Sequence, residues 1–144
     1  MSILRFCDEE PAIVRPDSTV AEAIQAMMAH HVGAVGVVDG TRAVGIFTER
    51  DVLSKLALCG LDPARIPVKE LMSTPVETIT PDTSPGDAFT TMIGHHFRHL
   101  PVVDRSGKLL RILSIRNLLE AQVEELRQQL DSLEQYVTND SLGG

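Results

Sequence analysis

Two segments of the chain carry hydrophobic side chains with a helical period. In residues 20–28 the apolar positions fall three or four apart, and Thr19 and Glu22 form a Thr-x-x-Glu capping pair at the start. Residues 88–93 repeat the pattern after Ser84 and a proline, which is also typical of a helix start. Each segment therefore predicts an amphipathic helix.

Two short runs rich in β-branched residues follow each predicted helix and flank a polar turn that contains glycine. This arrangement is typical of a β-hairpin. The runs are residues 34–38 and 43–47 after the first helix, and residues 99–103 and 109–113 after the second. Helical patterns resume at Thr48 and Ser114. With a short extended segment before each first helix, we expect the order strand, helix, strand, strand, helix twice.

The chain contains an internal duplication. Residues 16–39 align with residues 81–104, and nine of these 24 positions are identical, whereas ordinary residue frequencies give about one or two by chance. We therefore expect a first repeat at residues 11–58 and a second repeat at residues 75–119. The remaining parts are a lead-in (1–10), a linker (59–74), a C-terminal amphipathic helix (120–138) and a frayed tail (139–144).

Neither repeat is long enough for a convincing domain, because about 50 residues bury too little surface. We expect the two βαββα repeats to pack sheet to sheet with pseudo-two-fold symmetry, which gives an α+β fold with a long C-terminal helix. Small-molecule sites favour junctions of this kind.

The C-terminal helix carries apolar residues at the 4-3-4-3-4 spacing of a short coiled coil. These residues are Leu119, Val123, Leu126, Leu130, Leu133 and Val137. Three interpretations stay open: pairing with a second copy of the chain, folding back onto its own domain, or docking on another protein. We expect a homodimer.

Composition narrows the class of protein. The 144 residues carry 13 basic and 20 acidic side chains, a net charge of −7, with 3% aromatic residues and no tryptophan, which argues against nucleic acid as a partner. No apolar run approaches the roughly 20 residues of a membrane span. Cys7 and Cys59 match no metal or redox spacing. With no signal peptide and no catalytic motif evident, we expect a cytoplasmic protein that is not an enzyme.

Several strings of the two repeats resemble tandem cystathionine β-synthase (CBS) domains, the pair called a Bateman module. They are Pro16–Ala23, Val37–Asp39 and Val44–Leu53 in the first repeat, and Ile79–Thr83 and Leu100–Asp104 in the second. The resemblance implies a regulatory module that binds an adenosine-containing ligand such as AMP, ADP, ATP or S-adenosylmethionine, and that passes a conformational change to a dimer partner or an unidentified effector protein.

By position, the resemblance assigns Asp51 to the ribose hydroxyls and Thr48 to the phosphate or ribose. A carboxylate suits a vicinal diol because it accepts hydrogen bonds from both hydroxyls. The other residues of this main site are Gly45 and Ile46 beside Pro75, Val76 and Glu77 for the adenine, and Arg98 and His99 for the phosphate. A second site at Ser114 and Asn117 departs from the pattern, because Arg111 replaces the glycine and Asn117 the aspartate, and we expect it to be weaker.

Other interpretations of these residues stay open. Thr48 and Asp51 also form an ordinary helix-start signature, and a structural dimerisation module without nucleotide is an alternative function. The histidine pairs His30-His31 and His95-His96 suggest a metal-binding protein as a further alternative. Adjacent histidines at a helix end point in different directions, however, and no cysteine or carboxylate completes a ligand set, so we expect no metal site.

Overall fold

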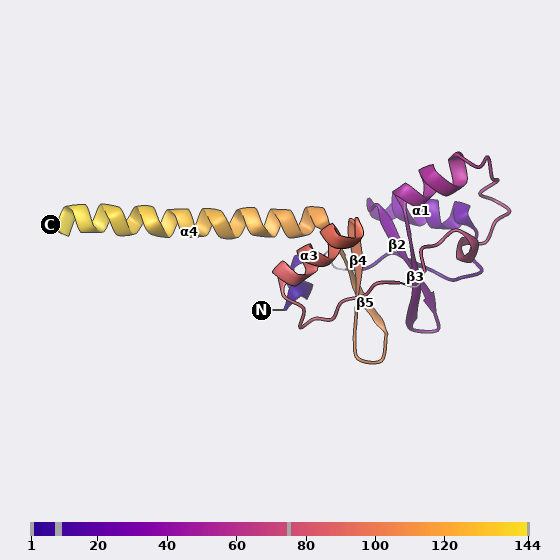
Figure 1. Cartoon of the computed structure of the whole chain (residues 1–144), viewed down its shortest axis with the longest axis horizontal. Helices are drawn as coiled ribbons and strands as arrows, with labels where there is room; N and C mark the ends of the chain where they lie inside the picture. The colour runs from indigo at the N-terminus through magenta and orange to yellow at the C-terminus, as the bar shows by residue number, and fades with distance from the viewer. Residues whose placement is uncertain (1, 8–9, 75, 144) are drawn as a thin grey trace.

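The computed structural model describes residues 2–7, 10–74 and 76–143, with side chains through Thr138. The first repeat contains β1 (Ile13–Val14), α1 (Val20–His30), β2 (Ala34–Asp39), β3 (Arg42–Thr48), α2 (Glu49–Asp51) and the π-helical turn η2 (Val52–Ala57). The second contains α3 (Pro85–His95), β4 (His99–Val103), β5 (Leu109–Ser114) and α4 (Ile115–Gly143). Short 3₁₀ helices, η1 (Ile3–Phe6) and η3 (Val68–Glu70), lie in the lead-in and the linker (Figure 1).

The predicted helix starts are confirmed. The Thr19 hydroxyl accepts a hydrogen bond from the Glu22 N–H at the start of α1, and the Ser84 hydroxyl accepts one from the Asp87 N–H at the start of α3. Both helices end at a histidine with positive φ, His31 at 54° and His96 at 59°. The second histidine of each repeated pair is therefore a helix C-cap in the left-handed conformation that glycine more often adopts.

The two sheets differ in size. β1 pairs in parallel with β2, and β2 pairs antiparallel with β3, whereas the second sheet has only β4 antiparallel to β5 among the described residues. The strand expected at the start of the second repeat is reduced to a single bridge between Ile79 and Val102. In the first repeat the Gly36 N–H donates to Ala12 O at 2.9 Å, whereas Pro101, which takes the place of Gly36 in the second repeat, has no N–H to donate.

The sheets pack against each other through a small apolar cluster of Val38, Ala43, Val103 and Leu109. A Cβ on Gly36 would overlap the side chain of Leu109, so this glycine allows the second sheet to approach β2. The hairpins also join through backbone hydrogen bonds, from Ala43 N–H to Gly107 O at 3.0 Å and from Leu109 N–H to Thr41 O at 3.2 Å. The expected sheet-to-sheet packing of two repeats is confirmed.

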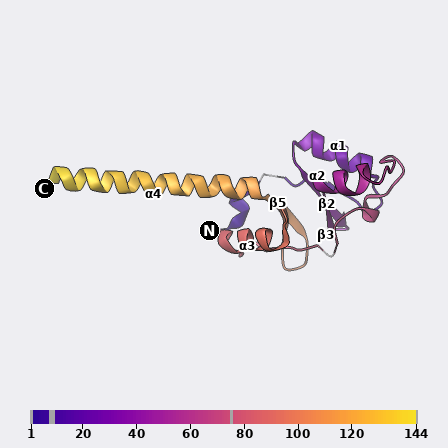
Figure 2. The same cartoon turned by 45° about the horizontal axis from the view of Figure 1, so that its top comes forward.

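The N-terminal lead-in belongs to the core of the second repeat, which the sequence pattern did not indicate. Ile3 is fully buried in a cluster with Leu100, Leu113 and Leu118. Its N–H donates to Pro81 O at 3.4 Å. Figures 1 and 2 both show this N-terminal segment beside α3 and the start of α4. The lead-in therefore supplies apolar surface that the second repeat lacks.

Helix α4 extends away from the rest of the molecule (Figures 1 and 2). Leu118 is fully buried, but no described side chain from Leu119 to Thr138 is. The interpretation in which this helix folds back onto its own domain is therefore wrong. The prediction of a frayed tail from residue 139 is also wrong for the backbone, since α4 continues to Gly143. From residue 115 onward the sequence has no proline and no glycine before residue 143, so no helix-breaking residue ends the helix earlier. Among the described helices, none has the length and apolar character to cross a membrane.

Candidate functional site

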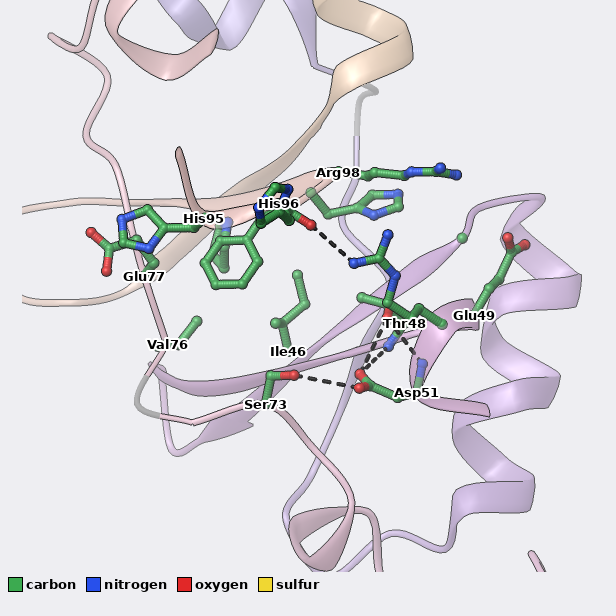
Figure 3. Close-up of a pocket in the computed structure, with 15 residues that line it drawn as sticks. Ile46, Thr48, Glu49, Asp51, Ser73, Val76, Glu77, His95, His96 and Arg98 are labelled. Carbon is green, nitrogen blue, oxygen red and sulfur yellow. Dashed lines mark hydrogen bonds between the residues drawn. The ribbon is translucent and has the colours of Figure 1, made fainter. Parts of the chain in front are cut away.

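A cleft of about 180 Å³ lies between the two repeats. One wall is the junction of β3 and α2, the second is the end of the linker, and the third is the turn between α3 and β4 (Figure 3). Seven of the predicted main-site residues line it: Ile46, Thr48, Asp51, Val76, Glu77, Arg98 and His99. Pro75 lies outside the described residues. The structure thus brings together side chains from both repeats that are up to 53 positions apart, from Ile46 to His99.

Thr48 and Asp51 form a reciprocal capping box at the start of α2. The Asp51 N–H donates to Thr48 Oγ1 at 3.3 Å, and the Thr48 N–H donates to Asp51 Oδ2 at 2.9 Å. The Thr48 hydroxyl also donates to Oδ2, at 3.2 Å. The capping role is therefore real, and it holds the carboxylate in one orientation at the floor of the cleft.

The other carboxylate oxygen of Asp51 faces the linker and η2. Oδ1 lies 3.1 Å from Lys55 Nζ and accepts a hydrogen bond from Ser73 Oγ at 3.4 Å. Asp51 is 5% exposed, and no other charged residue is buried among those that the structure describes. Both carboxylate oxygens therefore have partners within the chain, and the contact from Ser73, at the long end of hydrogen-bond distance, is the weakest of them.

Gly45 does not line the cleft, so the prediction that places it in the adenine slot is wrong. A Cβ at Gly45 would overlap the side chain of Met72, which fills the space on that side of β3. The absence of a side chain at this position serves the packing of the linker on the sheet. The neighbouring Ile46 points into the cleft (Figure 3) and anchors the linker, since it exchanges backbone hydrogen bonds with Ser73 at 2.8 and 3.3 Å.

The positive charge of the cleft comes from arginines. Burial lowers the pKa of the His99 imidazole below its ordinary value, Arg98 lowers it further, and Glu49 opposes the shift. His99 is therefore largely neutral at about pH 7 and offers a hydrogen-bonding ring rather than a charge. The sequence pattern missed Arg50, which lines the cleft and whose Nη1 donates to His96 O of the other repeat at 3.1 Å.

Other lining residues also escaped sequence reasoning. Ser73 follows the Lys-Glu-Leu-Met string of the linker, which gave no sign that its hydroxyl meets Asp51. Phe97 stacks on His95, with ring centroids 5.4 Å apart, and both line the cleft. The only signal for them was their place in the turn that precedes Arg98.

The predicted second site lies in a wider cleft of about 1300 Å³ that residues of both repeats line. Ser114 and Asn117 line it and are hydrogen-bonded to each other, with the Asn117 N–H donating to Ser114 Oγ at 3.0 Å. Arg111 is not among the described residues that line either cleft. Arg98 and His99 line both clefts, so the two sites share one wall.

The histidine pairs do not assemble a metal site among the described residues, where no three histidine, cysteine or carboxylate side chains are grouped for a metal ion. His30 Nδ1 lies 2.9 Å from Ala26 O within α1. His31 and His96 are the helix caps described above. Helix termination accounts for the second histidine of each repeated pair.

The chain matches proteins that contain CBS domains. The family model of the CBS domain matches it twice, over residues 4–58 and 68–124. An uncharacterized 17.7 kDa protein from Acidianus ambivalens is 40% identical over 110 residues, which cover 76% of this chain and 65% of that protein. Alignments with two further curated relatives cover 55% and 18% of their lengths, so the chain spans less than two thirds of these relatives.

Solved structures share both the fold and its two-repeat arrangement. A protein with CBS domains from Burkholderia ambifaria is 30% identical, with a TM-score of 0.79 over 86% of this chain and 95% of that chain. A CBS domain protein from Pyrobaculum aerophilum, solved in complex with AMP, is 25% identical, with a TM-score of 0.74 over 81% of this chain and 89% of that chain. The two repeats, their packing and these matches together show that the chain belongs to the CBS-domain family and carries two CBS domains in tandem.

Proposed function

We propose that this tandem CBS pair senses an adenosine-containing ligand of the AMP, ADP or ATP class, or S-adenosylmethionine, in the cleft between its repeats. Tandem CBS pairs are regulatory ligand-binding modules. The observation that carries the proposal is Asp51, a buried carboxylate held at the floor of a cleft that both repeats line. The AMP complex of the Pyrobaculum relative supports the choice of ligand.

The lining of the cleft suits the three parts of such a ligand. Ile46 and Val76 offer apolar surface to a purine, and Oδ1 of Asp51 offers an acceptor to the ribose hydroxyls. Arg98 and Arg50 offer positive charge to a phosphate. A ribose hydroxyl that binds Asp51 would replace the long contact from Ser73, so the ligand would exchange one hydrogen bond for another.

Binding would act on the arrangement of the repeats, because the ligand would touch Asp51 from one repeat and Arg98 from the other. A ligand shifts a conformational equilibrium only when its affinity differs between the two states. The bridge from Arg50 to the His96 carbonyl is one contact that such a shift would change. We propose that the protein regulates an effector in the cytoplasm in this way and is not itself an enzyme.

The test is isothermal titration calorimetry with each of the four ligands on the parent chain and on Asp51→Asn. Asparagine is the residue that the second repeat uses at this position, where its side-chain oxygen accepts a hydrogen bond from the Ser114 hydroxyl and its N–H donates to Ser114 Oγ, so the variant is expected to fold. Losing a charge-assisted hydrogen bond costs about 1.5–3 kcal/mol, which corresponds to an affinity roughly 10- to 100-fold weaker. The control is Asp87→Asn, which changes the same group at the start of α3 outside both clefts.

The alternative, a structural module without bound nucleotide, is favoured by one observation. Both oxygens of Asp51 already have partners within the chain, namely Thr48, Lys55 and Ser73, so the carboxylate needs no ligand. If none of the four ligands releases heat or raises the melting temperature of the parent chain at about millimolar concentration, the structural interpretation replaces the sensor.

A further inference from the structure

Helix α4 presents an apolar line that no described part of its own chain covers. The line consists of Leu119, Val123, Leu126, Leu130, Leu133 and Val137, and these side chains are between 47% and 62% exposed. We call it the α4 seam. From its first to its last residue it spans about 27 Å of helix. Single exposed apolar residues are ordinary on protein surfaces, but a continuous line of this length marks an interaction surface.

The seam does not face the body of the molecule. Leu118 is fully buried against the second repeat, whereas Leu119 is one position further and therefore rotated by about 100° around the helix. The rest of the seam follows the direction of Leu119, since its residues alternate three and four apart. A helix can therefore approach the seam alongside the body without displacing the contacts of Leu118.

The residues of the seam match the preferences of one specific partner, another copy of the same helix. Leucine occupies every second seam position, at Leu119, Leu126 and Leu133, and these correspond to position d of the heptad. Position a carries Val123, Leu130 and Val137. β-Branched residues at position a combined with leucine at position d favour a parallel, two-stranded coiled coil.

The charges beside the seam also permit self-pairing in a parallel orientation. Gln122 and Gln129 occupy position g, and Arg127 and Glu134 occupy position e. In a parallel pair in register, Gln122 faces the partner's Arg127 and Gln129 faces the partner's Glu134. No two like charges meet in these pairs, although the chain as a whole is acidic. The acidic side chains Glu124, Glu125 and Asp131 lie at the outer positions b and c.

We propose that two copies of this chain associate through the α4 seam as a parallel, in-register coiled coil. The two CBS pairs then lie at the same end of the dimer, where each α4 begins. Each of the six seam side chains is already about half covered. The area that they can bury on pairing is therefore less than the roughly 800 Å² per partner of a standard interface. We therefore expect a dimer that dissociates within a range of about 1–100 µM. This pairing needs no bound nucleotide and stands apart from the sensor proposal.

Sedimentation equilibrium of the full chain over that concentration range tests the association. The seam variant Leu126→Glu with Leu133→Glu is expected to be monomeric throughout, because it places four glutamates in the seam of the pair. Its matched control is Gln128→Glu with Gln135→Glu, which adds the same charge at position f and is expected to stay dimeric. A parent chain that is monomeric over the whole range overturns the proposal, and so does a seam variant that dimerises like the parent.

Disulfide formation tests the orientation. In a background with Cys7→Ser and Cys59→Ser, which removes both native thiols, Leu130→Cys places one thiol at a central position a of each helix. These thiols face each other in a parallel, in-register pair, but in an antiparallel pair position a faces position d. We expect a covalent dimer from Leu130→Cys under mild oxidation and none from Gln128→Cys. A dimer that leaves Leu130→Cys reduced, or that links Gln128→Cys equally well, overturns the parallel arrangement.

Discussion

Replacing Ile3 by alanine tests whether the N-terminal lead-in is part of the second CBS domain. Ile3 is fully buried and packs in the cluster that holds Leu100, Leu113 and Leu118. Leu100 belongs to β4, the strand that begins at His99 and follows Arg98 in the cleft wall. The substitution therefore removes apolar contacts from the cluster that contains Leu100, two positions after Arg98.

The expected loss follows from the burial of the side chain. Removing most of a buried isoleucine side chain costs about 2–5 kcal/mol, which includes the cavity left behind. Ile3 lies near the end of the chain, in a four-residue 3₁₀ helix, so the segment can relax into the space and the lower half of this range applies. For a chain of this size, a loss of about 2–3 kcal/mol lowers the melting temperature by about 5–10 °C.

Chemical denaturation of the parent and of Ile3→Ala measures the free energy of unfolding directly. The matched control is Ile93→Ala, the same substitution at an isoleucine of α3 that is 54% exposed. We expect the control to lose about 1 kcal/mol or less, since half of its side chain already contacts water. Equal losses of stability for Ile3→Ala and Ile93→Ala would refute the reasoning, because they would mean that the lead-in contributes nothing to the core of the second repeat.

Three further changes probe the cleft and its surroundings. Arg50→Met should weaken binding of AMP by about tenfold but leave adenosine binding unchanged, because Arg50 would contact only the phosphate. Calorimetry measures the affinity for both ligands, and an equal loss of affinity for AMP and adenosine would exclude the phosphate role. His99 has a lowered pKa in the folded state, so the unfolded state binds more protons once the pH falls below about 6.5. The melting temperature should therefore decrease below that pH, and His99→Gln should make this decrease smaller. Gly45→Ala should cost about 1–3 kcal/mol by overpacking against Met72, and Met72→Ala in the same chain should recover part of the loss, whereas additive losses would show that the two positions do not touch.

The features predicted well from sequence are those with a local cause. Thr19 and Ser84 cap their helices because a hydroxyl at that position satisfies free backbone N–H groups, whatever packs around it. The duplication predicted two repeats and their junction, and most of the expected main-site residues line the cleft there. These residues lie in short sequence strings, and each string fixes the positions of its residues at the end of a strand. Their place in the cleft therefore follows once the two repeats pack together.

The failures concern contacts between segments far apart in the chain. Gly45 was predicted to contact the ligand because of its place in a short sequence string. In the structure Met72 occupies the space beside Gly45, and no local sequence pattern relates these two residues. The apolar residues of the lead-in, Ile3, Leu4 and Phe6, lie in a segment too short for a periodic signal, and the burial of Ile3 depends on residues of the second repeat far along the chain. Arg50 sits in the same string as Asp51, yet its role depends on the carbonyl of His96 in the other repeat.

The turn between α3 and β4 is joined to the start of α4 by a hydrogen bond, and this contact links the cleft to α4. The N–H of Ile115, the first residue of α4, donates to the carbonyl of Arg98 at 2.8 Å. Arg98 lines both clefts, and the first turns of α4 line the wider one through Arg116 and Glu120. Under the proposed function, a phosphate that moved the backbone of Arg98 would act on the start of the helix that carries the seam. Coupling between two binding events is reciprocal, so to the extent that a ligand strengthens pairing of the helices, pairing must strengthen binding of that ligand by the same factor.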